Sequence, residues 1–227
     1  MTMRTTSFIL AAIFLAAFNP AAAEPANLGK LKTELVAYES SGRYEQDFAA
    51  VIAQARRFLD ARADAYAKPA LVLDIDETTL SNWTEIQAND FAYLPNADCN
   101  ALPAGPCGML AWDKSRQAAA FPATLALYAD AQSHGVAVFF ITGRHEAERQ
   151  WTEANLRNAG YQAWAGLYME PDGAHFRSAA DFKSAERGQI EAQGYHIVAN
   201  VGDQQSDLAG GHAARGFKLP NPFYFIQ

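Results

Sequence analysis

The chain has 227 residues, half of them hydrophobic, and a net charge of −7 at pH 7. This acidic balance, without a basic run or stripe, argues against binding of a nucleic-acid polymer through its phosphates. The length suits a single domain with a substantial core, and we find no internal repeat or interdomain linker.

The first 23 residues have the pattern of a signal peptide. Arg4 supplies a positive start, residues 8–18 form an apolar run of the usual length, and alanines at 21–23 offer a cleavage site. An uncleaved membrane anchor is the alternative, but the run is shorter than the roughly 20 apolar residues that a spanning helix needs. We therefore predict cleavage near Glu24, a mature domain over residues 24–227 without a membrane segment, and a periplasmic or secreted location.

Helical patterns and short apolar runs alternate along the mature chain. Apolar residues recur at helical spacing from Tyr44 to Leu59, and Pro69 ends that pattern. Further helices are predicted at 121–134, 146–158 and 180–193, and strands at 70–74, 136–141, 163–169, 196–201 and, as a last edge strand, 223–226. The alternation predicts an α/β fold with a mainly parallel sheet, whose strands are covered on both faces.

Residues 81–115 interrupt this alternation, because they are rich in Asn, Pro and Gly. We interpret them as a small cap inserted after the first strand. Both cysteines, Cys99 and Cys107, lie in this segment, and in an oxidising compartment we favour a disulfide between them. Closing so short a loop contributes about 2–3 kcal/mol on the chain-entropy model. Zinc is the alternative, but two thiols without a nearby histidine make a poor tetrahedral site.

Polar residues cluster at or near the ends of the predicted strands, where ligands bind in parallel sheets. They belong to four segments in chain order: Asp74 and Asp76; Thr142, Gly143 and Arg144; Lys183; and Asp203 and Asp207. Any one of these segments is common on its own. Four of them in this order, each at a strand end or on the helix before one, are much more specific.

The acidic residues of this set favour a magnesium site. Asp74, Asp203 and Asp207 are expected to converge at one edge of the sheet, and three close carboxylates cannot all stay ionised without compensation. Mg²⁺ suits such a place because it binds few carboxylates and keeps water or a phosphate oxygen as further ligands. The same ion reduces the repulsion between an anionic nucleophile and an anionic phosphate ester.

The remaining residues fit phosphoryl transfer from a small phosphomonoester. Asp74 is the expected nucleophile, and Asp76 the acid that protonates the leaving oxygen and then the base that activates water. The Thr142 hydroxyl and the Gly143 amide are expected to hold phosphoryl oxygens, and Lys183 to add positive charge during transfer.

Four parts of this set also have a purely structural alternative. Asp76 could cap a turn, and residues 142–144 could form a turn. Lys183 and Arg187, one helical turn apart, could belong to a solvated face, and for Arg187 we leave contact with the site open. Asp207 could be an acid near a helix N-terminus. All four being structural at once is the less favoured reading.

The motifs resemble those of the haloacid dehalogenase superfamily, specifically the acid phosphatases of subfamily IIIB. That group includes bacterial class C nonspecific acid phosphatases and plant vegetative storage proteins. The likeness covers nearly the whole mature chain, and its segments are 74–82, 141–144, Asn155–Leu156, Gly160–Tyr161 and the ending 217–226. Two departures stand out, because the chain lacks the lipoprotein cysteine common in the bacterial enzymes and has two cysteines in its cap.

The resemblance implies a Rossmann-like, three-layer α/β/α fold, magnesium as cofactor and a two-step mechanism through phosphoaspartate. It implies that Asp74 and Asp203 ligate the metal by side chain and Asp76 by its backbone carbonyl. Asp207 is expected to support the metal site directly or through water. Whether the protein is a monomer or a homodimer stays open.

Three functional hypotheses follow. The first is a phosphatase, with nucleoside monophosphates as substrates if the cap aromatics Trp83, Phe91, Tyr93 and Trp112 stack a base; they could equally be the core of the cap. The second is a storage or binding protein on the same fold, against which the presence of both Asp74 and Asp76 argues. The third, a phosphorylated receiver, is disfavoured by the signal peptide and by the position of the motif at 202–207.

Overall fold

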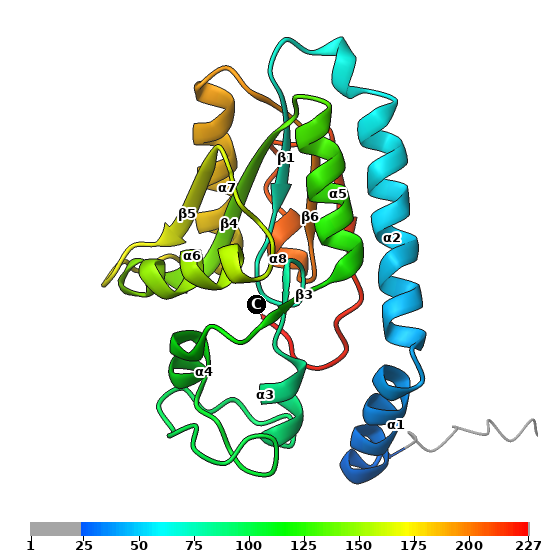
Figure 1. The fold of residues 1–227 in the computed structure, drawn as a ribbon, viewed down its shortest axis with the longest axis vertical. Helices are drawn as coiled ribbons and strands as arrows, with labels where there is room; N and C mark the ends of the chain where they lie inside the picture. The colour runs from blue at the N-terminus through cyan, green and yellow to red at the C-terminus, as the bar shows by residue number, and fades with distance from the viewer. Residues whose placement is uncertain (1–23, 227) are drawn as a thin grey trace, which may run out of the picture.

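The computed structural model describes residues 24–226, so the predicted signal peptide lies outside the described residues. Within 24–226, none of the helices combines the length and the apolar character that crossing a bilayer requires. Figure 1 shows an α/β body at the top and a smaller lobe below it, facing the end of the sheet at which the strands terminate.

The body contains a sheet of five parallel strands, in the spatial order β5-β4-β1-β6-β7. In chain order the strands are β1 (Pro69–Leu73), β4 (Ala137–His145), β5 (Gly166–Glu170), β6 (His196–Gly202) and β7 (Arg215–Lys218). The prediction of an α/β fold with a mainly parallel sheet is confirmed. The predicted edge strand at 223–226 is wrong, since β7 occupies that edge and residues 223–226 form no ladder.

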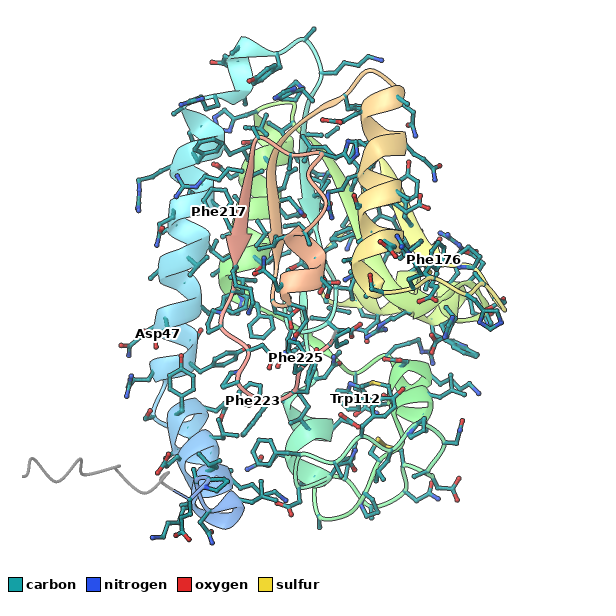
Figure 2. All side chains as sticks on the ribbon, turned by 180° about the vertical axis from the view of Figure 1, so that it is seen from behind. Asp47, Trp112, Phe176, Phe217, Phe223 and Phe225 are labelled. Atoms are coloured by element: carbon teal, nitrogen blue, oxygen red, sulfur yellow. A yellow bond between two sulfur atoms is a disulfide. The ribbon has the colours of Figure 1, made fainter. Side chains whose placement is uncertain are left out.

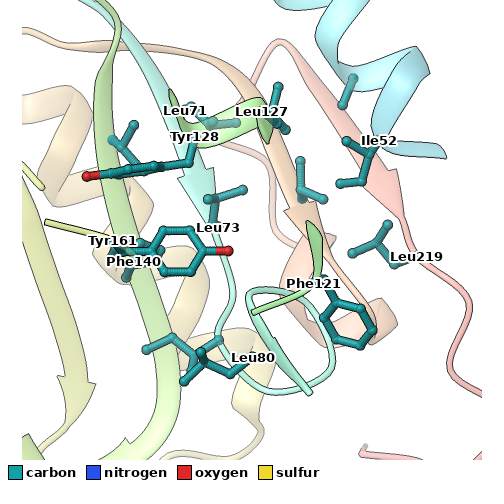
Figure 3. Close-up of a cluster of buried hydrophobic side chains, with 14 of the residues drawn as sticks. Ile52, Leu71, Leu73, Leu80, Phe121, Leu127, Tyr128, Phe140, Tyr161 and Leu219 are labelled. Carbon is teal, nitrogen blue, oxygen red and sulfur yellow. The ribbon is translucent and has the colours of Figure 1, made fainter. Parts of the chain in front are cut away.

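Helices cover both faces of this sheet. On one face lie α2 (Arg43–Asp60) and α5 (Pro122–Ser133), which contact each other, while α7 (Ala179–Ala192) packs against β4 and β6 from the other face. Figure 3 shows the larger core, where Ile52 from α2 and Leu127 from α5 lie close to Leu71 and Leu73 of β1. Outside the smaller lobe, the further helices are α1 (Leu28–Ser40), α6 (Arg149–Asn158), the short α8 (Gln205–Leu208), and the 3-10 turns η1 (Ala63–Ala65) and η2 (Glu146–Glu148).

The lobe is inserted between two short strands that pair antiparallel, β2 (Leu80–Ser81) and β3 (Ala119–Ala120). It contains α3 (Trp83–Ala88), α4 (Met109–Ser115) and the connecting loop, and we call residues 82–118 the cap. Cys99 and Cys107 form a disulfide in that loop, as expected. Packing of apolar rings holds the cap to the tail of the chain, because the ring centroids of Trp83 and Phe223 are 5.0 Å apart.

Candidate active site

Three carboxylates meet at the end of the sheet that faces the cap. Asp74 follows β1 directly, and Asp203 and Asp207 follow β6. Oxygen atoms of the three lie within 4.8 Å of one another, and all three side chains are buried. The parallel strands β1 and β6 are neighbours in register up to Leu73 and Val201, which is why Asp74 and Asp203, far apart in the chain, lie side by side.

Lys183 of α7 is the cation of this cluster. Its ammonium nitrogen Nζ lies 2.6 Å from Oδ1 of Asp74 and 2.5 Å from Oδ1 of Asp207. Burial alone would lower the pKa of Lys183, but Asp207 and Asp74 outweigh it and raise that pKa. Lys183 is therefore a buried ion-paired lysine, and the solvated-face alternative does not hold for it.

The cluster has more negative than positive groups, and its carboxyl pKa values reflect this. Burial raises the pKa of Asp74 well above the ordinary value, and the charges of Asp207 and Asp203 raise that pKa further, while Lys183 lowers it. The pKa of Asp203 is also raised, by burial and then by Asp207. One lysine for three carboxylates is the situation that a bound divalent cation corrects.

The donor set fits a hard cation such as Mg²⁺. All the converging atoms are oxygens, and no histidine or cysteine joins the group among residues 24–226. Mg²⁺ prefers oxygen ligands and is commonly held by one or two carboxylates plus substrate phosphate and water. Asp74 and Asp203 offer side-chain oxygens for it.

Close packing around β6 places Asp207. A Cβ atom added to Gly202 would lie only 2.4 Å from Cβ of Asp207, so this strand end needs a glycine. Arg187 of α7, which is fully buried, holds the same turn by donating to the carbonyl oxygens of Asp207 at 2.6 Å and of Gly211 at 2.9 Å. Arg187 thus supports the site through the backbone, and the solvated-face alternative is wrong for it as well.

Asp203 is oriented by three donors that the sequence analysis did not identify. Its Oδ1 accepts a hydrogen bond from Thr78 at 3.1 Å, and its Oδ2 accepts from Gln204 and Asn221, each at 2.7 Å. Asn221 belongs to the C-terminal segment, whose resemblance to the family ending was the only available signal for it. Three donors on one carboxylate fix its direction toward the cluster.

The tail also reaches the loop after β1. The Tyr224 hydroxyl donates to Oε2 of Glu77 at 2.9 Å, and Oε1 of Glu77 accepts from the backbone amide of Asn82 at 2.6 Å. Glu77 itself has a φ of 51°, a conformation that costs energy outside glycine and recurs at functional turns. Burial, and then the charge of Asp76, raises the pKa of Glu77 to about 8.

Asp76 lies on the cap side of this loop rather than among the three carboxylates. Arg144 donates to it from Nη2 at 2.6 Å and from Nε at 3.1 Å, and Asn82 donates to its Oδ1 at 2.8 Å. Burial would raise the pKa of Asp76, but Arg144 and Asn82 outweigh it and hold that pKa below its usual value. Arg144 and Asn82 belong to the sequence motifs, but no role was predicted for either side chain.

The phosphate-binding candidates lie on β4, whose backbone continues past them to His145. Residues 142–144 therefore extend the strand, with an irregular register against β5, and are not a separate turn. Thr142 is buried, and its hydroxyl oxygen accepts from the amide of Arg144 at 3.1 Å, which leaves its own proton free to donate. Gly143 is exposed, with open space where a Cβ would point.

Comparison with known proteins identifies the family of the chain. The model of the HAD superfamily, subfamily IIIB (Acid phosphatase), matches residues 11–227. The chain belongs to this acid phosphatase family. Its curated relatives include the Stem 28 kDa glycoprotein of Glycine max, which is 35% identical over 84% of this chain and 72% of its own length.

Other members of the family bear enzyme and storage names. Acid phosphatase 1 of Solanum lycopersicum is 35% identical over 68% of this chain and 58% of its own length. Vegetative storage protein 1 of Arabidopsis thaliana is 30% identical over 68% of this chain and 54% of its own length. Among solved structures, the class C acid phosphatase of Bacillus anthracis has the same fold, with a TM-score of 0.66 and 20% identity over 87% of this chain and 86% of that one.

Proposed function

We propose that the protein hydrolyses small phosphomonoesters in two steps, with Asp74 as the nucleophile. In the first step an Asp74 oxygen bonds to phosphorus, the bond from phosphorus to the ester oxygen breaks, and Asp76 gives its proton to the departing alcohol. In the second step water attacks phosphorus and passes a proton to Asp76, and phosphate leaves Asp74. Placement of Asp74 beside Lys183, with Asp76 two residues further on, is the observation that carries this proposal.

The residues around the site have matching tasks. Thr142 and Gly143 donate hydrogen bonds to the phosphoryl oxygens, and Lys183 stabilises negative charge that develops during transfer. Asp74 and Asp203 would hold Mg²⁺ by side chain and Asp76 by its backbone carbonyl, with Asp207 supporting them. When bound, the ion would neutralise carboxylate and phosphate charge.

Export and substrate choice extend the proposal. The N-terminal pattern of a signal peptide supports a periplasmic or secreted enzyme. Preference for nucleoside monophosphates has weaker support, since Trp83 and Phe91 pack against Phe223 and only Tyr93 of the four cap aromatics is mostly exposed, at 72%. Equal kcat/KM values for 5′-AMP and p-nitrophenyl phosphate would remove the nucleotide preference.

A storage or binding role is the second candidate, and the storage names among the relatives favour it. The buried pairing of Lys183 with Asp74 and Asp207 argues for the enzyme, because burying three carboxylates is costly for a protein that has no use for them. The decisive experiment therefore compares variants of the two motif aspartates in the mature protein.

Asp74→Asn is expected to abolish phosphatase activity without unfolding the protein. Asp76→Asn should lower kcat/KM for alkyl phosphates by about 10²–10⁴-fold, the usual contribution of general acid catalysis, and much less for p-nitrophenyl phosphate, whose leaving group needs little protonation. Steady-state kinetics with both substrates, together with thermal melts, measure these effects. Full activity of Asp74→Asn would contradict the nucleophile, and equal slowing of both substrates by Asp76→Asn would contradict the acid.

A further inference from the structure

Two consecutive residues of cap helix α4, Trp112 and Asp113, are linked to Asp76 through one intermediate side chain each. Both are buried, with exposures of 3%. Asp76 itself lies in the loop after β1, so these links run from the cap to the body of the molecule. Figure 2 shows Trp112 on the side of the cap that faces the body.

Arg144 forms the first link. Its Nη2 atom lies 2.6 Å from Oδ1 of Asp76 and 2.9 Å from Oδ1 of Asp113, so one guanidinium joins a carboxylate of the loop to a carboxylate of the cap. Asp113 Oδ1 is buried and has no well-aligned hydrogen bond, which makes Arg144 its source of compensation. A third contact, from Nη1 to the Thr152 hydroxyl at 3.4 Å, ties the guanidinium to α6.

Asn82 forms the second link, and it is fully buried. Its amide nitrogen Nδ2 donates to Oδ1 of Asp76 at 2.8 Å and to Glu77 at 3.1 Å. Its amide oxygen accepts from the indole nitrogen of Trp112 at 2.8 Å. Because the oxygen is occupied by Trp112, the amide is held with its nitrogen toward Asp76.

These contacts leave the Asp76 carboxylate with little freedom to rotate, since its two donors, Arg144 and Asn82, each also contact a side chain of α4. Removing one partner of a buried charged pair leaves the other uncompensated and free to reorient. We propose that helix α4 of the cap positions Asp76 for proton transfer, Asp113 acting through Arg144 and Trp112 through Asn82. This inference depends on the acid role of Asp76 proposed above.

The dependence of kcat/KM on the leaving group tests the proposal, because kcat/KM includes the steps up to the departure of the alcohol. Asp113→Asn and Trp112→Phe are expected to lower kcat/KM for ethyl phosphate by about tenfold, part of the contribution of acid catalysis, and to change it for p-nitrophenyl phosphate by much less. Glu85→Gln is the matched control. It alters a buried carboxyl of the same cap, bonded to Asn89, and should leave the ratio of the two kcat/KM values unchanged.

The double variant Asp76→Asn/Asp113→Asn distinguishes action through Asp76 from a general effect on the cap. Its substrate ratio should equal that of Asp76→Asn alone, because coupled residues are non-additive. Equal loss for both substrates in Asp113→Asn, or an additive ratio in the double variant, would overturn the positioning role. If Asp113→Asn does not fold, Trp112→Phe decides by the same ratio. A substrate ratio in Asp76→Asn like that of the parent protein would instead refute the acid itself.

Discussion

Asp76 is negatively charged in the absence of substrate, whereas its proposed role as an acid requires a proton. Arg144 and Asn82 keep the pKa of this carboxyl low, so without substrate Asp76 is a carboxylate. Protonating an alcohol requires it to carry a proton. A phosphate dianion bound next to Asp76 favours proton uptake, because a like charge raises the pKa of a carboxyl group. The acid is thus expected to be formed as the substrate binds.

Glu85 of α3 gives a prediction about stability and pH. Burial raises the pKa of this carboxyl from 4.5 to about 7. Between these values the folded state binds more protons than the unfolded state, so the free energy of unfolding falls as pH rises through that window. Glu85→Gln removes the titrating group, and its thermal midpoint should decline less between pH 4.5 and 7.5 than that of the parent protein.

The control for this measurement is Glu34→Gln, which alters an exposed acid on α1. Its melting temperature should follow the same dependence on pH as the parent protein. If Glu85→Gln also followed the parent curve, the raised pKa of Glu85 would be refuted.

Among the secondary-structure elements, buried strands were the most predictable. Strands β1, β4 and β6 are covered on both faces, and their continuous apolar runs mark them. Helix α1 was missed, and none of its side chains is fully buried, since Leu35 and Tyr38 are only partly buried against the core. Strand β7 was missed because only Phe217 of its four residues is buried. Residues 223–226 carry strand-forming side chains, but Phe223 packs on Tyr44 and Trp83 instead of entering a ladder.

In the candidate site, the residues near strand ends were predictable from the sequence and the residues on loops were not. Asp74 and Asp203 lie just beyond strand ends and Thr142 lies near the end of β4, and parallel strands bring such positions together whatever path the loops take. Asn82, Asn221 and Tyr224 reach the site along loops, whose path in space has no periodic signature in the sequence. The contacts of Arg144 with Asp76 and with Asp113 of the cap were equally unpredictable from the sequence, because they depend on how α4 lies against the body.

For the molecule as a whole, removal of the metal tests whether a bound cation balances the charge of the buried carboxylates. Chelation with EDTA should inactivate the enzyme and lower its thermal midpoint, because the buried carboxylates then lose a ligand that binds only the folded state. Added Mg²⁺ should restore both properties. Phosphatase assays and thermal melts before and after chelation measure the change. Asp203→Asn is the control and should show a smaller shift in midpoint, whereas full activity after exhaustive dialysis against EDTA would contradict the metal site.

The folding back of residues 221–224 onto the loop after β1 has a consequence for biosynthesis. Asn221 is one of the donors that orient Asp203, and Tyr224 is bonded to Glu77, 147 positions earlier in the chain. While these residues are still inside the ribosome, strand β7 just before them is inside it as well, so the emerging chain lacks the edge strand of its sheet and both contacts. The finished arrangement of carboxylates therefore matures only after translation has passed position 224, so that a nascent chain is not yet a working phosphatase.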